Sequence, residues 1–428
     1  MITTREPVYD LANFTETTQE IDLEQISEEA GRALLRVGGV QGTDVELEGA
    51  ARDFGLHALA LNLLAAYIHE IPGHRVSNAA EIPDIDVPLE EGKHPRRVMS
   101  AFAKRFGESS AEVELLRILG LFSSPADKNE IAAVRAAPPI SDLTEHVQEL
   151  SDAEWFQHIK KLRHLKLFVP ESRHRPESLD TRPLVREHFG NQLKAEYPEA
   201  WREANNRLYE YYKASAKKYP DTLEEMAPLF AAVMHGCQAG KHQEAWSIYY
   251  SRIQQRSTTN YICSQLGAFG AGLAVMSNYF EKLWGKPANA LETYSKATVL
   301  GNASFLRGLG RLSEAAQPMQ VSLEMFIAQK EWEQSTIVTS NLSELYLTIG
   351  DVKGALAYAE QSVQLADRIS DWQSYIISRQ ALANALNQAD QLVKAKSVFN
   401  MQKKCKRKTS LNFHFLVQYK VFITAICC

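Results

Sequence analysis

A pattern that repeats every 40 residues is the strongest constraint on the fold of this 428-residue chain. The repeating positions are Ala315, Ala355 and Ala395, with an aliphatic residue three places before each of them, at Leu312, Val352 and Leu392. A small residue lets two helices approach closely, and the Gly or Asp that precedes it supplies a turn. Such helix pairs cannot bury their apolar faces alone, so they stack. The pattern therefore predicts an α-solenoid.

From Trp201 onward the sequence indicates helix after helix, with no convincing strand. The repeated text resembles tetratricopeptide repeats, with a period longer than the usual length of about 34 residues. We expect divergent helical repeats over 192–300 and tetratricopeptide-like repeats over 301–400. A solenoid of this kind is expected to bind a protein or peptide on its concave face. The candidate contact residues are Ser343, Tyr346, Ser378 and Asn384.

The segment 17–95 has the pattern of a small helical domain followed by a connector. Apolar residues on one face predict a first helix, and they are Ile26, Ala30, Ala33, Leu34 and Val37. Ser27 is the expected N-cap of this helix, and Gly38 with Gly39 its expected end. A second helix runs through LHALALNLLAAYI, and the proline-containing stretch 77–95 is expected to be the connector.

The segment 96–191 predicts three helices and then a β-hairpin, which is the order of a winged helix. The spacing of Val98, Phe102 and Phe106 indicates the first helix. The stretch SSAE, beginning at Ser109, predicts a capping box for the second helix, and DAEWFQHIKKLRHL predicts the third. The runs 167–169 and 178–181 are the expected hairpin arms, and Pro183 is expected at the first position of a further helix.

Three motifs in the first 190 residues resemble signal-transduction NTPases of the STAND class, which includes the NB-ARC and NACHT proteins. The opening T-T-R resembles the end of the family's sensor strand, and this implies that Arg5 meets the γ-phosphate. The stretch HALALNLL resembles the G-x-P-L-A-L motif that lies against the nucleotide base, with Leu56 at the glycine position and Ala58 at the proline position. The stretch TRPLVREHF resembles the family's winged-helix element, with Arg182 in place of the histidine that touches the β-phosphate.

The chain contains no G-x-x-x-x-G-K-[ST] loop, and no apolar strand ending in two acids precedes Thr3. That loop cradles phosphates and its hydroxyl holds magnesium, so we expect neither ATP hydrolysis nor a tightly bound cofactor. We expect residues 1–16 to be the remnant of an NTPase core in an N-terminally truncated chain. The resemblance implies ATP or ADP with magnesium, and possible self-association, in a complete family member. It implies for this chain a regulatory and ligand-sensing part of an ATP/ADP-switched signalling or defence protein.

Charge and composition limit the partners and the compartment. The chain has 47 Lys and Arg against 52 Asp and Glu, a net charge of −5, which argues against binding DNA or an anionic membrane. The most apolar stretch, 54–68, is too short for a membrane span and is expected to be a buried helix. No signal peptide is recognisable, and the five cysteines form no disulfide or metal-binding pattern. These features favour the cytoplasm.

Two other functions stay open. One is a stand-alone tetratricopeptide adaptor that needs no nucleotide. The other is a winged-helix transcription regulator, since the third winged-helix segment carries basic residues where a DNA reader would place them: Lys160, Lys161, Arg163, His164 and Lys166. A solvated face fits the acidic balance of the chain better. The tail 401–428, basic and rich in cysteine, is not expected to be a functional module, and a shifted reading frame would explain it.

Three further motifs have simpler interpretations than a site. His69 and His74 are five residues apart across Pro72-Gly73, which favours a loop over a zinc site. The glycines at 38–42 follow a helix rather than a strand, which favours a helix end over a phosphate loop. The tyrosines at 209, 211 and 212 are expected to pack within a helical region rather than to form a ligand cage.

Overall fold

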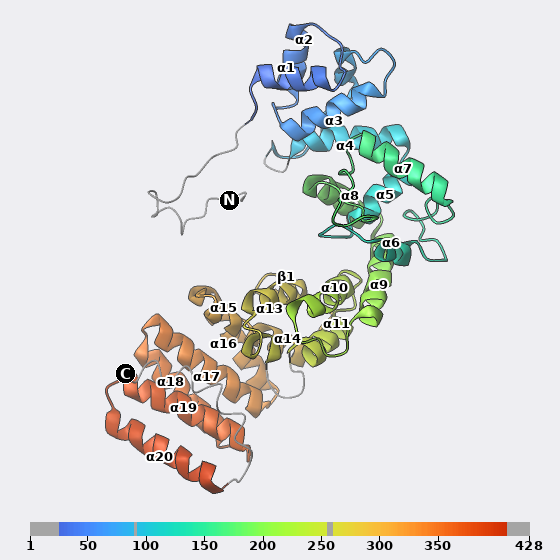
Figure 1. Ribbon diagram of the computed structural model, residues 1–428. Helices are drawn as coiled ribbons and strands as arrows, with labels where there is room; N and C mark the ends of the chain where they lie inside the picture. Colours follow the sequence, from blue (N-terminus) through green and yellow to red (C-terminus); the bar gives the residue numbers. More distant parts are fainter. Residues whose placement is uncertain (1–24, 90–91, 255–259, 409–428) are drawn as a thin grey trace. The chain divides into compact units, whose positions relative to one another are not determined.

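The computed structural model describes residues 25–89, 92–254 and 260–408, and the protein is mostly α-helical (Figure 1). The chain forms two compact units that divide between Ala200 and Trp201. The fold class is therefore confirmed as helices followed by a tetratricopeptide-like solenoid. The expected strand remnant at 1–16, including Arg5, lies outside the described residues.

The first unit is built from short helices. They are α1 (Glu28–Val37), α2 (Asp44–Asp53), α3 (Ala58–His69), the 3-10 helix η2 (Val76–Glu81), α4 (Lys93–Phe106), α5 (Ala111–Leu119), α6 (Lys128–Arg135), α7 (Asp152–His164) and α8 (Pro183–Glu196). Helix α1 packs on α2 and α3, and α3 packs on α4. Helix α5 packs on α4, α7 and α8.

Helix α1 has the expected ends but a different buried face. Ser27 caps its N-terminus by accepting a hydrogen bond from the Ala30 N–H, and Gly38 is its C-cap. The buried residues are Gly31 and Leu35, whereas Val37, which was expected on the inner face, is 91% exposed. The expected face was wrong because α2 comes very close to Gly31, where an added Cβ would lie 2.9 Å from the Ala51 Cβ.

Several boundaries in this unit differ from those predicted. Helices α2 and α6 were not predicted, although Thr43 and Asp127 each form a capping box that the sequence could have revealed. Helix α4 begins at Lys93, within the expected connector, and the connector also contains η2. The N-cap of α5 is Ser110 rather than Ser109, because the Ser110 hydroxyl accepts from the Val113 N–H.

The expected hairpin is present as isolated bridges rather than full strands. Phe168 pairs with Thr181, and Leu179 pairs with Ala126, both antiparallel. The chain then enters α8 with Pro183 at the start of the helix, as predicted. The two bridges thus pair the segment after the hairpin turn, which leads into α8, with the segment after α5 and with the segment after α7.

The second unit begins with irregular helical hairpins. Its elements are α9 (Pro198–Ser215), α10 (Leu223–Gln238), α11 (His242–Ile248), the π-helix η4 (Tyr249–Gln254), α12 (Tyr261–Ser264), α13 (Phe269–Met276), the 3-10 helix η5 (Ser277–Tyr279), β1 (Phe280–Lys282), β2 (Lys286–Pro287), α14 (Thr293–Gly301) and α15 (Ser304–Gly308). The antiparallel pair β1 and β2 corrects the expectation that this region has no strand. Within the core of this region, Trp246, Tyr249 and Tyr279 are in mutual ring contact.

The 40-residue repeat is confirmed as stacked helices. They are α16 (Leu312–Ala328), α17 (Trp332–Ile349), α18 (Val352–Ala366), α19 (Trp372–Gln388) and α20 (Leu392–Lys408), which lie side by side in Figure 1. Helix α17 packs on α16, α18 and α19, and α19 also packs on α18 and α20. The turns before α16, α18 and α20 contain Gly310, Gly350 and Asp390, all with φ between 59° and 93°.

Helix α20 also corrects the expected start of the tail. It continues through 401 to Lys408, so the helical pattern does not stop at Phe399. The rest of the tail, 409–428, lies outside the described residues.

Candidate functional sites

In the first unit, the start of α4 contacts both the segment before α3 and the first turn of α8. His94 in the first turn of α4 packs against Gly55, and an added Cβ on Gly55 would lie 2.4 Å from the His94 ring. Gly92, the N-cap of α4, packs against Leu184 of α8, with an added Cβ 2.9 Å from the Leu184 side chain. Both glycines also have positive φ, at 66° and 78°. Helix α4 therefore connects the segment before α3 with the start of α8.

Ala58 is the first residue of α3 and is exposed at this junction. His57 caps the helix, because its Nδ1 accepts a hydrogen bond from the Ala60 N–H at 3.4 Å. Leu56, at the motif's glycine position, has φ of 51°, in the left-handed region that favours glycine. The backbone thus has the shape that the motif's glycine would adopt without strain.

Arg182 is the N-cap of α8 and is half-buried. Two neighbouring cations are already paired, Arg186 with Asp180 and Arg96 with Glu187, the latter at 2.7 Å. No hydrogen bond or ion pair joins the Arg182 side chain to any other residue in the described part of the chain. A helix N-terminus favours anions, so this arginine is placed where it could contact one.

Two cations at the start of α4, Lys93 and Arg97, hold the loop that precedes this helix. Lys93 pairs with Asp84 at 2.8 Å. Arg97 donates to the carbonyl oxygens of Ile82, Pro83 and Asp53. Burial, with a smaller contribution from the charge of Arg96, lowers the pKa of His188 to about 4. This imidazole is therefore neutral at pH 7 and adds no charge to the junction.

The two serine candidates of the solenoid are inside it. Ser343 and Ser378 are both 0% exposed. The Ser343 hydroxyl donates to the Ala355 carbonyl oxygen at 2.9 Å, because α17 and α18 approach closely at this alanine. The Ser378 hydroxyl donates to the Tyr375 carbonyl oxygen of its own helix. Neither hydroxyl is a surface group, which corrects the expectation that they face a partner.

Tyr346 and Asn384 are half-buried. The Tyr346 hydroxyl accepts from Gln320 at 2.9 Å, and its ring centroid lies 5.1 Å from that of Tyr358. This tyrosine therefore helps to join α16, α17 and α18. Asn384 is better placed for a partner, since it belongs to a row of partly or fully exposed residues along α19.

Rows of accessible residues run along α17 and α19 at helical spacing, and we call them the open face. On α17 they are Gln334, Ile337, Asn341, Glu344 and Thr348, and on α19 they are Gln373, Ile377, Gln380, Asn384 and Asn387. Ile337 and Ile377 are 40 residues apart, so the repeat places the same apolar residue on both helices. The sequence could have revealed this face, had the repeat been used to compare exposed positions as well as small ones.

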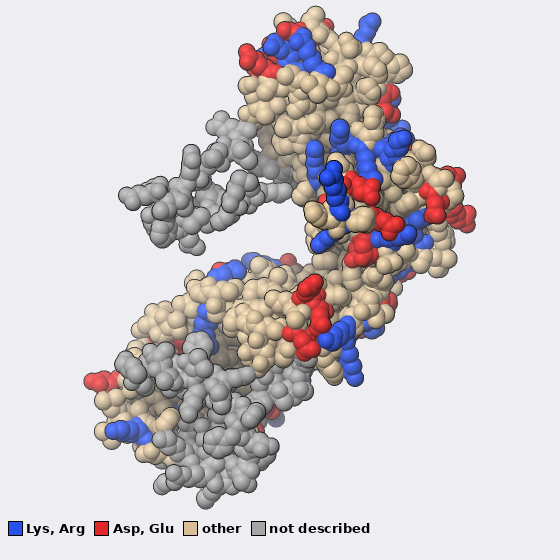
Figure 2. All heavy atoms as spheres, viewed as in Figure 1, with Lys and Arg blue, Asp and Glu red and all other residues tan. Residues whose placement is uncertain are grey.

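The basic residues of α7 are partly neutralised. Lys161 pairs with Glu112, and Arg163 pairs with Glu171 at 3.3 Å. Asp152 and Glu154 lie in the first turn of the same helix. On the face shown in Figure 2, basic and acidic side chains are interspersed. This arrangement fits a solvated surface better than a nucleic-acid interface.

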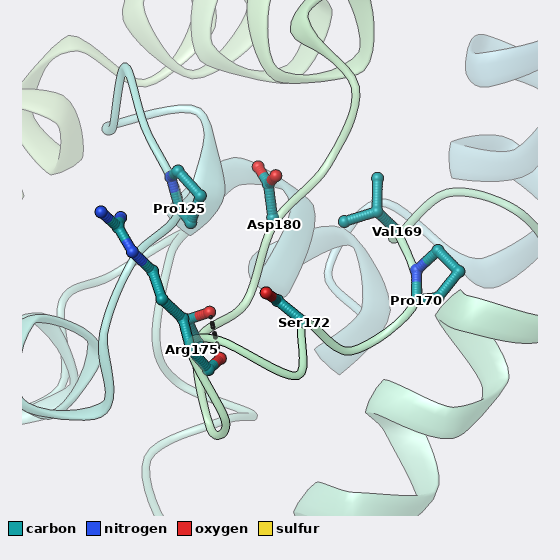
Figure 3. A pocket seen from close by; sticks show the side chains of 7 residues that line it. Pro125, Val169, Pro170, Ser172, Arg175 and Asp180 are labelled. Carbon is teal, nitrogen blue, oxygen red and sulfur yellow. Dashed lines mark hydrogen bonds between the residues drawn. The ribbon is translucent and has the colours of Figure 1, made fainter.

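A small cavity of about 200 Å³ lies beside the bridged hairpin segments (Figure 3). It is lined by Pro125, Val169, Pro170, Ser172, Arg175, Ser178 and Asp180. Two of its polar side chains are already engaged, since Asp180 pairs with Arg186 and the Ser178 hydroxyl donates to the Arg175 carbonyl oxygen. We therefore assign no site to it.

The other motifs take the simpler interpretation. The rings of His69 and His74 stack face to face at 4.6 Å, and no group of three or more potential ligands in the described residues could hold a metal. Tyr209 is 1% exposed, and Tyr212 stacks on the buried His235. Within the residues described, no helix is both long enough and apolar enough to cross a membrane.

No protein-family model matches the chain, and a search of curated proteins finds no match. Among solved structures, the chain is similar to the crystal structure of a Signal Transduction ATPase with Numerous Domains (STAND) protein with a tetratricopeptide repeat sensor from Pyrococcus horikoshii. The TM-score is 0.36 and the sequence identity 13%, over 95% of this chain and 62% of that chain. The chain thus spans less than two thirds of that protein. A likeness this distant assigns no residue and no activity.

Proposed function

We propose that this chain is a regulatory and partner-sensing part of a nucleotide-switched signalling protein of the STAND class, and that it binds a protein or peptide on the open face of α17 and α19. The observation that carries the partner-binding role is the stack of 40-residue helix pairs, which aligns Ile337 with Ile377 on adjacent first helices. Stacked hairpins of this kind form extended binding surfaces. Partner binding in the cytoplasm is the role that this surface and the charge of the chain support best.

The regulatory role is supported by the junction of α3, α4 and α8. Leu56 has a left-handed backbone where the resembled motif has glycine, and Arg182 stands at the N-terminus of α8 without a protein partner in the described residues. Beside a phosphate-binding loop, these positions would contact a nucleotide from its periphery. Arg5 would complete the set, and the described residues do not include it.

The partner-binding role is tested with peptides selected from a random display library against the full chain. Asn384→Arg adds bulk and charge at the centre of the open face and should weaken the selected peptides by about tenfold or more. Glu360→Arg, at an exposed position on α18, is the matched control and should change their affinity by less than about twofold. If Lys160→Glu on α7 abolished binding while Asn384→Arg did not, the partner surface would lie in the first unit and the proposal would be wrong.

A further inference from the structure

Three histidine rings are in contact where the ends of α3 and α7 meet. His69 is the last residue of α3, His74 lies in the loop that follows, and His164 is the last residue of α7. The rings of His69 and His74 stack with their centroids 4.6 Å apart, and the His164 ring meets the His69 ring edge-on at 5.8 Å. We call these three side chains the histidine cluster, and His69 is its central ring.

The backbone holds the two stacked rings in place. Gly73 and His74 both have positive φ, at 85° and 46°, and turn the chain back toward the end of α3. The His74 carbonyl oxygen accepts from the Gln41 N–H at 2.7 Å. Gly39 packs against His69, since an added Cβ on this glycine would lie 3.2 Å from the His69 Nδ1. The stack is therefore fixed by the loop after α3 and by the loop between α1 and α2.

The contacts within the cluster favour neutral imidazoles. The Nδ1 atom of His74 is buried and has no hydrogen-bond partner among the described residues. A charged imidazole carries an N–H on both nitrogens, so a proton at this atom would be buried without an acceptor. Two charged rings with centroids 4.6 Å or 5.8 Å apart would also repel each other. Charging the central ring and either neighbour thus works against the contact.

The charged side chains near the cluster are mostly cations. They are Glu70 and Arg75 in the loop after α3, Lys104 and Arg105 in the last turn of α4, and Lys160, Lys161 and Arg163 on α7. The loop at 38–42 has no charged residue. Arg105 donates to the Glu70 carbonyl oxygen at 2.5 Å, and the acids Glu112 and Glu171 pair with Lys161 and Arg163. Over the part of the chain that the structure describes, no carboxylate forms an ion pair with the three histidines.

The two helix ends favour a charged histidine when its ring stands alone. The C-terminus of a helix carries a partial negative charge, which stabilises a cation in the last turn. His69 and His164 both occupy such an end, and both side chains are exposed. Each ring can therefore hold a proton on its own helix, but the two charges oppose each other while the rings touch.

We propose that the histidine cluster is a pH-sensitive contact, which joins α7 to the end of α3 at neutral pH and opens as the pH falls below about 6. Proton uptake by His69 and His164 places like charges on the two helices, and each charge stays stabilised by its own helix end after they separate. The contact therefore adds stability above this pH and loses it on acidification. This inference goes beyond the proposed function and does not depend on partner binding.

The test measures amide hydrogen exchange in the full chain at about pH 7.5 and about pH 5.5, corrected for the intrinsic effect of pH on exchange. The reporters are the Leu165 N–H, which donates to the Lys161 carbonyl oxygen at 3.0 Å, and the Gln41 N–H. Protection of both should fall by about tenfold at the lower pH. His69→Gln removes the central charge and should reduce this change to less than about twofold.

Two matched variants keep the histidine cluster intact. His174→Gln, at an exposed position in the hairpin turn, and His188→Gln, which removes a buried imidazole, should both leave the change at Leu165 as in the unaltered chain. Salt at about 1 M should restore part of the protection at the lower pH without any substitution, because it screens exposed charges. Equal protection at both pH values, a full response in His69→Gln, or no effect of salt would each overturn the pH-sensitive contact.

Discussion

Replacing Gly120 by alanine should destabilise the first unit by forcing α5 and α8 apart. An added Cβ on Gly120 would lie 2.5 Å from both the Cα and the N of Gly190, whereas ordinary contacts begin at 3.4 Å. The obstacle is backbone, so no side chain can move aside, and the helices would have to separate by about 1 Å. Gly120 has φ of −65°, which alanine adopts freely. The cost is therefore steric.

The magnitude follows from two opposing effects. Overpacking of this kind costs up to about 3 kcal/mol. Replacing glycine by alanine in a helical conformation raises the free energy of unfolding by up to about 1 kcal/mol. The net loss in the free energy of unfolding should be about 2 kcal/mol. Since α8 also carries Arg182 at its start, separation of the two helices should displace the junction with α4.

Hydrogen exchange at the amides of α5 and α8 in increasing guanidinium would measure this loss in the first unit alone, because the two units can unfold separately. Gly49→Ala in α2 is the matched control, since an added Cβ there meets nothing within 4 Å and should be neutral or stabilising. Gly120→Ala with Gly190→Ala should cost less than the sum of the single changes, because both create the same clash. Equal stability of the Gly120 and Gly49 variants would refute the close crossing.

Three other predictions concern nucleotide, pH and the solenoid. Titration calorimetry with ADP and magnesium should give no dissociation constant below about 10 μM, and a tighter value would contradict the expectation of an incomplete nucleotide site. The first unit should lose up to roughly 3 kcal/mol of stability as pH falls from about 6.5 to about 4, because His188 has a pKa of about 4 in the folded chain and a higher pKa in the unfolded chain. In urea titrations at several pH values, His188→Gln should reduce this dependence of the free energy of unfolding on pH. Gly350→Ala should cost the second unit about 1 kcal/mol in thermal unfolding, because φ is 93° there, whereas Gly270→Ala should not.

Features that depend on neighbouring residues were predicted better from the sequence than features that depend on residues far apart in the chain. Ser27, Gly38 and Pro183 stand at the helix ends where they were expected, because a cap or a turn depends on only a few neighbouring residues. The 40-residue register was readable for the same reason, since each repeat makes the same contacts with its neighbours. The unpredicted α2 and α6 carry capping boxes of the same local kind, so these two omissions were avoidable.

The candidate surface was harder to predict. Ser343 was expected to face a partner and instead bonds to Ala355, because the small residue that marks the repeat brings α18 onto that side of α17.

The sequence by itself determined that this protein is a series of helices that includes a solenoid with a 40-residue repeat, because helix caps, glycine turns and small residues act over one or two helical turns. Only the tertiary structure decided which faces are buried. In α1 the choice of Gly31 and Leu35 over Val37 depends on how closely α2 approaches, and in α17 the choice between the buried serines and the open face depends on where α18 and α19 lie. Contacts between distant segments select among the apolar and polar stripes that a helix offers, and that selection sets the surface left for a partner.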